Sequence, residues 1–259
     1  MKCRICGAIS EELHRATLLM KYEVQYYRCP RCGFVQTETP FWLEEAYSSP
    51  LSASDTGVMS RNLSYADLAS IILRLFCSPS DRFLDFGGGY GIFVRLMRDR
   101  GFDFYWFDKY AQNLMARGFE GSSSDTRYAA VTSFENFEHF ENPVEELERI
   151  TTISDLVLFS TTLISDKPPL PQEWWYYCLE HGQHISLYTH KALLHLAQLF
   201  NLKLTSDGVG LHILSKRDIH PKLFLVLKIA RRLRLGRLFW LPSKTFDDMH
   251  FIIEKGEQP

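Results

Sequence analysis

The chain has no apolar stretch long enough to span a bilayer and almost no excess charge of either sign. Its longest apolar runs, such as residues 223–227, are bounded by charged residues, whereas a membrane-spanning helix needs about 20 apolar residues in succession. No apolar signal region follows Met1. The formal net charge of the 259 residues is -2, so the composition argues against a general polyanion binder. These absences predict a cytoplasmic protein.

Cysteine is scarce as well: six residues are too few for a scaffold held together by disulfides. Four of the six nevertheless form two pairs, each followed by glycine: Cys3 with Cys6, and Cys29 with Cys32. Each pair can present two thiolates to one ion, and four thiolates complete a closed tetrahedral zinc site, which is structural rather than catalytic. The sequence therefore predicts a zinc ribbon over residues 1–47, in which the ion supplies much of the folding free energy.

Two other interpretations of the cysteine pairs are a redox-active Cys-x-x-Cys motif and a spacing that arose by chance. The matching glycines favour zinc. Cys77 and Cys178 lack such partners, so we expect them to be buried small hydrophobic residues. After the ribbon we expect a linker and an N-terminal helix over residues 48–80, and the main domain over residues 81–259.

Glycine is concentrated in one short segment, residues 87–91. The flanking patterns predict a buried strand at 82–86, a helix at 92–100 and a second strand at 102–107, which ends at Asp108. A strand, a glycine turn, a helix, a strand and an acidic residue form half of a doubly wound nucleotide-binding sheet. The alternative is a turn that serves the fold alone.

The spacing of these glycines excludes a dinucleotide motif. Ile92 and Val94 occupy the positions where the pattern GxGxxG would require glycine. Asp85, two residues before the first glycine, would repel a pyrophosphate and suits a ligand that carries an ammonium group. The ligand expected here is therefore a nucleoside with a cationic amine.

The run Asp85-x-Gly87-x-Gly89-x-Gly91 resembles the first motif of the class I S-adenosylmethionine-dependent methyltransferases. The resemblance extends to the methyltransferase domain 23 and ubiquinone O-methyltransferase-like families. It implies an α/β fold with a doubly wound, mostly parallel, seven-stranded sheet, similar to a Rossmann fold. It also implies that Asp85 and the three glycines line the methionine part of the cofactor, and that Asp108 binds its ribose. Phe134 and Glu135, the last residue of the next predicted strand at 128–134 and the residue after it, are further cofactor-binding candidates.

Carboxylates and imidazoles follow that strand in the run Glu135, Glu138 and His139. Their i, i+3, i+4 spacing places them on one face if the turn is helical. Such a set is a plausible divalent-metal site. The alternative is a Glu-His pair that orders the loop or contacts the cofactor without any metal.

This ExxEH pattern resembles the metal-assisted O-methyltransferases of ubiquinone biosynthesis and of small-RNA 3′-end methylation, in which a distant histidine completes the set. The segment 182–189 resembles their Gly-x-His segment, so His184 is the candidate here. The resemblance implies Mg²⁺ or Mn²⁺ held by Glu135, Glu138, His139 and His184, with Glu135, His139 and His184 as catalytic candidates. A bound cation would lower the pKa of an acceptor hydroxyl. We expect His181 and His190 to be surface or capping residues.

The C-terminal region contains a basic stretch over residues 216–237, with eight Lys or Arg and one acidic residue. This amphipathic segment fits contact with an anionic membrane at its inner face or with a lipid-linked substrate; it equally fits a packing helix with a solvated basic edge. An antiparallel pair is expected at 202–206 and 211–214. Residues 249–254 are expected to form a last strand.

These observations favour an S-adenosylmethionine-dependent O-methyltransferase that acts on a small-molecule or glycan hydroxyl. The ribbon followed by this core also resembles methyltransferases encoded with sugar and polysaccharide biosynthesis enzymes. One alternative is a ribosomal RNA methyltransferase, against which the near-neutral charge argues. The other is a non-catalytic scaffold with the cofactor fold.

Overall fold

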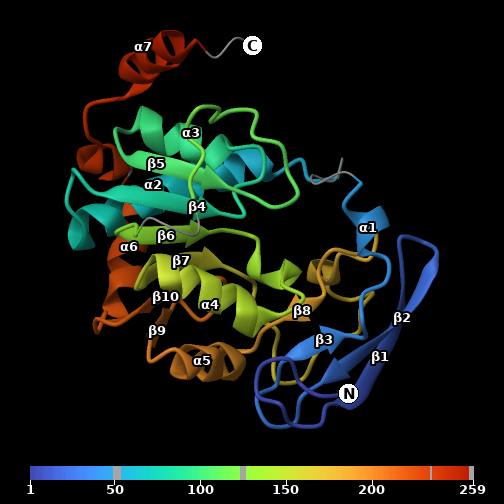
Figure 1. The fold of residues 1–259 in the computed structure, drawn as a ribbon. Coiled ribbons are helices and arrows are strands. Elements are labelled where there is room, and N and C mark those ends of the chain that lie inside the picture. The colour runs from blue at the N-terminus through green and yellow to red at the C-terminus, as the bar shows by residue number, and fades with distance from the viewer. Residues whose placement is uncertain (49–53, 123–126, 234, 257–259) are drawn as a thin grey trace. The chain divides into compact units, whose positions relative to one another are not determined.

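The computed structural model describes residues 1–48, 54–122, 127–233 and 235–256 (Figure 1). The chain forms two compact units. Unit 1 comprises Met1–Ser52, Phe134–Thr151 and Phe159–Ile219, and unit 2 comprises Ala53–Ser133, Thr152–Leu158 and His220–Pro259. The predicted end of the ribbon at residue 47 falls inside unit 1. Part of the predicted linker, residues 49–53, lies outside the described residues.

Unit 1 contains a four-stranded antiparallel sheet that combines the N-terminal segment with a strand from much later in the chain (Figure 1). The order is β1 (Glu11–Leu18), β2 (Tyr22–Arg28), β3 (Val35–Thr37) and β8 (Ser186–Leu187). Completely buried aromatic side chains pack against this sheet: Tyr26, Trp42, Tyr176 and Tyr177. The large apolar area that they bury is the main stabilising contribution in this core.

The other elements of unit 1 include the predicted antiparallel pair. They are α1 (Leu43–Ala46), η1 (Phe137–His139), most of α4 (Pro143–Ile153), η2 (Trp175–Tyr177), α5 (His190–Leu199), β9 (Lys203–Ser206) and β10 (Leu211–Ser215). Thr189 caps α5 by accepting a hydrogen bond from the Ala192 amide. The expected antiparallel pair is confirmed, and Asp207 shapes its turn by accepting the amides of Val209 and Gly210.

Unit 2 contains the predicted strand-turn-helix-strand segment almost residue for residue. The helix α2 (Val58–Phe76) precedes β4 (Arg82–Phe86), α3 (Ile92–Asp99), β5 (Asp103–Phe107) and β6 (Ala130–Ser133). β4 lies between β5 and β6, parallel to both, so Asp85 pairs with Trp106 on one side and Thr132 on the other. The carboxyl ends of these strands therefore leave the sheet at the same edge.

The prediction of a strand at 249–254 is wrong. These residues belong to α7 (Thr245–Lys255), which ends at Gly256 in the left-handed conformation. The helix is fixed by Asp248, whose carboxylate accepts hydrogen bonds from Arg95 and Arg98 of α3 at 2.7–2.8 Å. A long-range ion pair therefore overrides the strand-like local pattern.

The predicted basic helix is shorter than its charge pattern and lies within unit 2 as α6 (Lys222–Arg232), followed by the short η3 (Leu235–Phe239). Leu227 and Ala230 are buried, whereas Leu225, Val226 and Ile229 are exposed. Among the described residues, no helix combines the length and apolar character required to cross a membrane.

The predicted seven-stranded sheet is corrected to a mixed sheet of six strands within the described residues. The hydrogen-bonded order is β5-β4-β6-β7-β10-β9, and the division between the two units falls within β7 (Leu156–Ser160). The missing strand is explained by the helical conformation of α7.

Candidate functional site

The glycine-rich turn of unit 2 needs glycine for backbone reasons. Gly87, Gly89 and Gly91 have φ angles of 78°, 52° and 83°, a region that residues with a Cβ rarely adopt. A Cβ at Gly91 would lie 2.9 Å from Asn113 Oδ1, whereas a Cβ at Gly89 would meet nothing within 4 Å. The turn is therefore closely packed at its end and open at Gly89, where a ligand can approach the backbone.

Asp108 and Trp106 hold this turn in place. The Asp108 carboxylate accepts a hydrogen bond from the Gly89 amide at 2.9 Å, and from the amides of Tyr110 and Ala111 at 2.7 and 2.8 Å. Trp106 Nε1 donates to the Gly89 carbonyl at 2.8 Å. A carboxylate offers about four lone-pair positions, so Asp108 keeps capacity for a ligand hydroxyl. Sequence reasoning missed Trp106, because nothing in the motif marks the residue two positions before the acid.

Asp85 is a buried acid beside the turn. Its side chain is 3% exposed and accepts a hydrogen bond from Thr132 Oγ1 at 2.6 Å. Burial raises the pKa of Asp85 to about 7, and the charge of Asp108 adds to this effect, while the hydrogen bond from Thr132 opposes it. A cationic ligand group would favour the ionised carboxylate. The acid therefore suits an ammonium group, as the sequence predicts.

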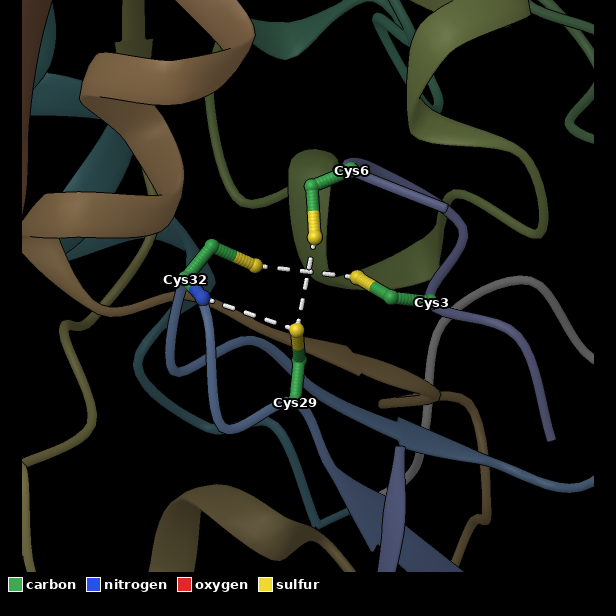
Figure 2. A group of neighbouring side chains, drawn as sticks. All are labelled: Cys3, Cys6, Cys29 and Cys32. Carbon is green, nitrogen blue, oxygen red and sulfur yellow. Dashed lines mark hydrogen bonds between the residues drawn. The ribbon is translucent and has the colours of Figure 1, made fainter. Parts of the chain in front are cut away.

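The four predicted zinc ligands of unit 1 converge on one point (Figure 2). The sulfur of Cys3 lies 3.6 Å from that of Cys32, and the sulfur of Cys6 lies 3.4 Å from that of Cys29. All four sulfurs lie within 4.8 Å of one another and none forms a disulfide. Zn–S bonds of about 2.3 Å in a tetrahedron separate the sulfurs by about 3.8 Å, so the four thiols fit a zinc ion.

The turns that carry these cysteines are built alike. The Gly7 amide donates to the Cys3 carbonyl at 3.0 Å, and the Gly33 amide donates to the Cys29 carbonyl at 2.9 Å. The Cys32 amide also donates to the Cys29 sulfur at 3.5 Å. Thr189 fixes the second turn by donating its hydroxyl to the Cys32 carbonyl at 2.8 Å. The two turns therefore preorganise the thiols.

A second cluster in unit 1 contains Glu138, His139 and His184, each of which places one ligand atom within 4.8 Å of those of the others. Glu138 is fully buried, and neither carboxylate oxygen has a hydrogen bond of ordinary geometry. Burial and the charge of Glu135 raise the pKa of Glu138 to about 8, although interactions with the hydroxyls of Tyr176 and Thr161 oppose this shift. A buried carboxylate without compensating partners is costly, and a bound cation would remove that cost.

Both imidazoles of this cluster are suited to act as ligands. Desolvation, with a smaller contribution from His181, lowers the pKa of His139 to about 3, so this ring is neutral at physiological pH. Its Nδ1 is hydrogen-bonded to the Tyr47 hydroxyl at 3.0 Å. His184 Nδ1 lies 2.7 Å from the Tyr176 carbonyl; because a carbonyl only accepts, Nδ1 carries the proton and Nε2 is the basic nitrogen. A backbone carbonyl that accepts from the other ring nitrogen commonly fixes the orientation of a metal-binding histidine.

Glu135 does not join the other three predicted residues. Its φ is 50°, and it forms a reciprocal pair with Ser160: the Glu135 amide donates to Ser160 Oγ at 2.7 Å, and Ser160 Oγ donates to Glu135 Oε1 at 2.6 Å. The left-handed backbone separates Glu135 from the short η1 helix that carries Glu138 and His139. Phe134 follows β6 directly.

Two residues that sequence reasoning assigned to other roles lie beside His184. Cys178 and His181 place their ligand atoms within 4.8 Å of that of His184 and of each other. The sequence predicts a buried small hydrophobic residue at Cys178 and a surface or capping residue at His181. The available signal was the spacing Cys178-x-x-His181-Gly182, which repeats the Cys-x-x-Cys-Gly pattern with one ligand exchanged.

Comparisons with known proteins give one family match. A family model described as "Methyltransferase domain" matches residues 59–207, more than half of the chain, which supports the predicted Rossmann-like fold. No curated protein matches the sequence.

Similar solved structures share 13–14% identity with the chain. The plantazolicin methyltransferase BpumL in complex with SAH has a TM-score of 0.47, with 66% of this chain and 94% of that chain covered. Human N-acetylserotonin methyltransferase in complex with SAM has a TM-score of 0.44, with 68% and 66% covered. CalO1 of calicheamicin biosynthesis has a TM-score of 0.42, and the match spans 59% of this chain and about half (54%) of that protein.

Proposed function

Because the chain belongs to the methyltransferase domain family, we propose that it transfers the methyl group of S-adenosylmethionine to a hydroxyl group of a small molecule or glycan. The observation that carries this proposal is the glycine turn of unit 2, with its open backbone at Gly89 and acids at Asp85 and Asp108. These groups match a ligand that has an ammonium group at one end and ribose hydroxyls at the other.

The cofactor residues have distinct roles in this proposal. Asp85 binds the ammonium group, since a buried acid with a raised pKa gains most from a nearby cation. The backbone of Gly87, Gly89 and Gly91 contacts the methionine part, and Asp108 accepts hydrogen bonds from the ribose. Phe134 and Glu135 are the remaining candidates for cofactor contact, because they directly follow the carboxyl end of β6.

The acceptor is a hydroxyl because the predicted catalytic residues offer proton-accepting and cation-binding groups. In the transfer, the acceptor oxygen displaces the sulfonium sulfur in line, so the methyl group moves to oxygen and the hydroxyl proton must leave. His184 Nε2 is suited to accept that proton, since Nδ1 donates to Tyr176. Glu135 and His139 are positioning candidates in this scheme, because His139 is too weakly basic to act alone.

A divalent cation would supply the same proton loss by another route. Glu138, His139 and His184 lie close enough to hold one ion, and a bound cation lowers the pKa of a coordinated hydroxyl. Two imidazoles and one carboxylate favour a transition metal such as Mn²⁺ over Mg²⁺, which prefers oxygen ligands. Support for cation assistance comes from the buried Glu138 carboxylate, whose oxygens have no hydrogen bond of ordinary geometry to a described residue.

Calorimetric titration of S-adenosylmethionine tests the cofactor assignment. We expect saturable binding to the wild-type protein and a loss of roughly tenfold to hundredfold in affinity for Asp108→Ala, the value of one or two charge-assisted hydrogen bonds. Asp207→Ala, at the tip of the β9–β10 hairpin, is the matched control and should bind normally. Absence of binding by the wild-type protein would refute the enzymatic function and favour a scaffold with this fold.

The basic α6 helix supports a further proposal about partners. Exposed Leu225, Val226 and Ile229 lie beside basic residues of the same helix, a combination that suits the surface of an anionic membrane or a lipid-linked acceptor. Flotation with vesicles that contain phosphatidylglycerol tests it. Binding that disappears in Val226→Asp would support the proposal, and failure of the wild-type protein to bind would refute it.

A further inference from the structure

A turn with the same glycine hydrogen bond as the two cysteine turns spans residues 178–182 of unit 1, although Cys178 itself has a left-handed backbone (φ 48°) that Cys3 and Cys29 do not share. In the two cysteine turns, the glycine amide donates to the carbonyl of the first cysteine. The Gly182 amide donates to the Cys178 carbonyl at 2.9 Å in the same way. The three glycines share a left-handed backbone, with φ of 70° at Gly7, 77° at Gly33 and 64° at Gly182. The glycine therefore follows the ligand residues in the same place in all three segments, while the convergence of the third set is shown by the distances between its ligand atoms.

The third turn presents Cys178 and His181, and His184 follows three residues later. One ligand atom from each lies within 4.8 Å of the others. Cys178 and His184 are buried, at 8% and 7% exposure. A thiol and two imidazoles converging in this way form a ligand set for a transition metal.

The surrounding contacts hold the third turn rigidly. Trp42 Nε1 donates to the Gly182 carbonyl at 2.8 Å, and Gln183 Nε2 donates to the Ala46 carbonyl at 2.7 Å. The Leu19 amide donates to the Leu179 carbonyl at 2.8 Å. The ligand residues therefore sit on backbone that is already fixed, as a preorganised metal site requires.

An independent observation points to a cation at this place. Glu138 is fully buried, and neither carboxylate oxygen has a hydrogen bond of ordinary geometry to a described residue; its ligand atom lies within 4.8 Å of that of His184. A positive ion bound to His184 would compensate this carboxylate. His184 belongs to two possible ligand sets, but its one basic nitrogen can bind a single ion. The other ligands of that ion, either Cys178 and His181 or Glu138 and His139, therefore determine which metal is bound.

We propose that Cys178, His181 and His184 hold a second zinc ion in unit 1, separate from the ion of the four cysteines. The thiolate selects a zinc-class metal and disfavours Mg²⁺ and Mn²⁺. Three protein ligands leave the fourth tetrahedral position open, as in catalytic zinc sites.

This ligand set is an alternative to the set of Glu138, His139 and His184, because His184 has one basic nitrogen. With that nitrogen bound to zinc, His184 would not accept the proton of the acceptor; the ion would lower the pKa of the hydroxyl instead. The inference rests on the proposed function only in assigning the open position to the acceptor hydroxyl, and the ion itself is tested without methyl transfer.

The metal content of the purified full-length chain, measured by mass spectrometry, tests the site. We expect about two zinc ions per chain in the wild type and about one in Cys178→Ser, because serine is a poor zinc ligand. His181→Gln should also lose about one ion, and it serves as the second variant if Cys178→Ser fails to fold. Cys77→Ser, a cysteine of unit 2 outside both clusters, should retain both ions.

A further variant separates this ligand set from the Glu138 set. Glu138→Gln should keep both ions, because the carboxylate is a neighbour and not a ligand in this proposal. Loss of one ion in Glu138→Gln with retention in Cys178→Ser would overturn the thiolate site, and so would a single ion in the wild type. Cobalt substitution gives a second readout: the visible absorption of four-coordinate cobalt should decrease in Cys178→Ser.

The proposed function and the metal site can fail separately. S-adenosylmethionine is titrated into the same samples. Two zinc ions without cofactor binding would refute methyl transfer and leave the metal site standing. Cofactor binding by a protein that holds a single zinc ion would refute the second metal site and leave the proposed methyl transfer standing.

Discussion

The two units hold their candidate ligands by opposite means. In unit 2 the site is continuous in sequence: one strand, one glycine turn and the end of the next strand supply Asp85, Gly89 and Asp108. In unit 1, side chains distant in sequence converge on two sites, with Cys3 meeting Cys32 and Glu138 meeting His184. A short sequence motif can predict a site that is formed by one continuous segment of backbone. A site formed by side chains that are distant in sequence can be identified only when the fold around it is known.

The electrostatics of the two regions differ accordingly. Asp108 is satisfied by three backbone amides. In unit 1, the buried Glu138 carboxylate has no hydrogen bond of ordinary geometry to a described residue and its pKa is raised to about 8, while the pKa of His139 is lowered to about 3. The backbone turn of unit 2 is therefore held by its own hydrogen bonds, whereas Asp85 beside it and Glu138 in unit 1 are buried acids that a cation would stabilise.

The largest expected effect is the loss of the four-cysteine site through Cys29→Ser. Structural zinc contributes on the order of 10–16 kcal/mol of apparent binding free energy in small zinc modules, so residues 1–37 should lose their ordered structure. Hydrogen exchange should show rapid exchange in this segment with the glycine turn of unit 2 unchanged. Cys77→Ser is the control, and normal protection of residues 1–37 in Cys29→Ser would contradict the zinc assignment.

The second largest expected effect is the loss of stability in Asp248→Ala, which tests whether unit 2 depends on the ion pair between Asp248 and Arg98. Asp248→Ala leaves Arg98, whose side chain is 5% exposed, without its main partner, although Asp103 still binds it. Removing one member of a buried ion pair costs about 3–5 kcal/mol. Urea unfolding should show this loss. The adjacent exposed Asp247→Ala should stay within about 0.5 kcal/mol of wild type; equal effects of both variants would show that the pair does not stabilise α7.

Asp85 should make stability depend on pH. Its pKa is about 7 in the folded protein and about 3.9 when unfolded, so the unfolded chain loses this proton first. The contribution of Asp85 to stability is therefore greatest below about pH 4, decreases as pH rises to about 7, and is constant above it. The total change is up to about 4 kcal/mol.

Asp85→Asn isolates this contribution. Thermal unfolding measured across this range should show a smaller decrease for the variant than for the wild type, because asparagine does not titrate. Cofactor binding provides a second test. The ammonium group of S-adenosylmethionine lowers the pKa of Asp85, so the wild-type protein should release a proton when it binds the cofactor below about pH 7. Identical pH profiles of the two proteins would contradict the raised pKa.

The smallest expected effect concerns the support of the turn. Trp106→Phe removes the hydrogen bond to the Gly89 carbonyl, which is worth about 1 kcal/mol, so the affinity for S-adenosylmethionine should fall about fivefold. Trp240→Phe, which alters a ring stacked with Arg100, should leave the affinity unchanged in calorimetry. A loss as large as that of Asp108→Ala would mean that the turn collapses without the indole.

The sequence was most informative where structure is decided locally. The segment 82–108 and the β9–β10 hairpin followed from glycine, acidic and alternating apolar residues. It was misleading where distant contacts decide: residues 249–254 look like a strand, but Asp248 joins α7 to Arg98 of α3. The predicted number of strands in the sheet, seven, was wrong for the same reason, since the described residues form six.

The candidate sites follow the same division. The four cysteines were found from spacing, because two short turns carry them. The backbone of Glu135 could not be foreseen, since its positive φ depends on the reciprocal pair with Ser160. The meeting of Glu138 with His184 rests on distant contacts such as the Ile185 amide that donates to the Glu138 carbonyl.

Hydrogen exchange with and without S-adenosylmethionine tests the central claim most directly, because it locates the cofactor site without knowledge of the acceptor. We predict that the cofactor slows exchange in peptides that cover residues 86–91 and 106–111, where the Gly89 amide and the amides bound to Asp108 lie. The cysteine turns of unit 1 should be unaffected. Unchanged exchange across 86–91 and 106–111 at saturating cofactor would contradict the account.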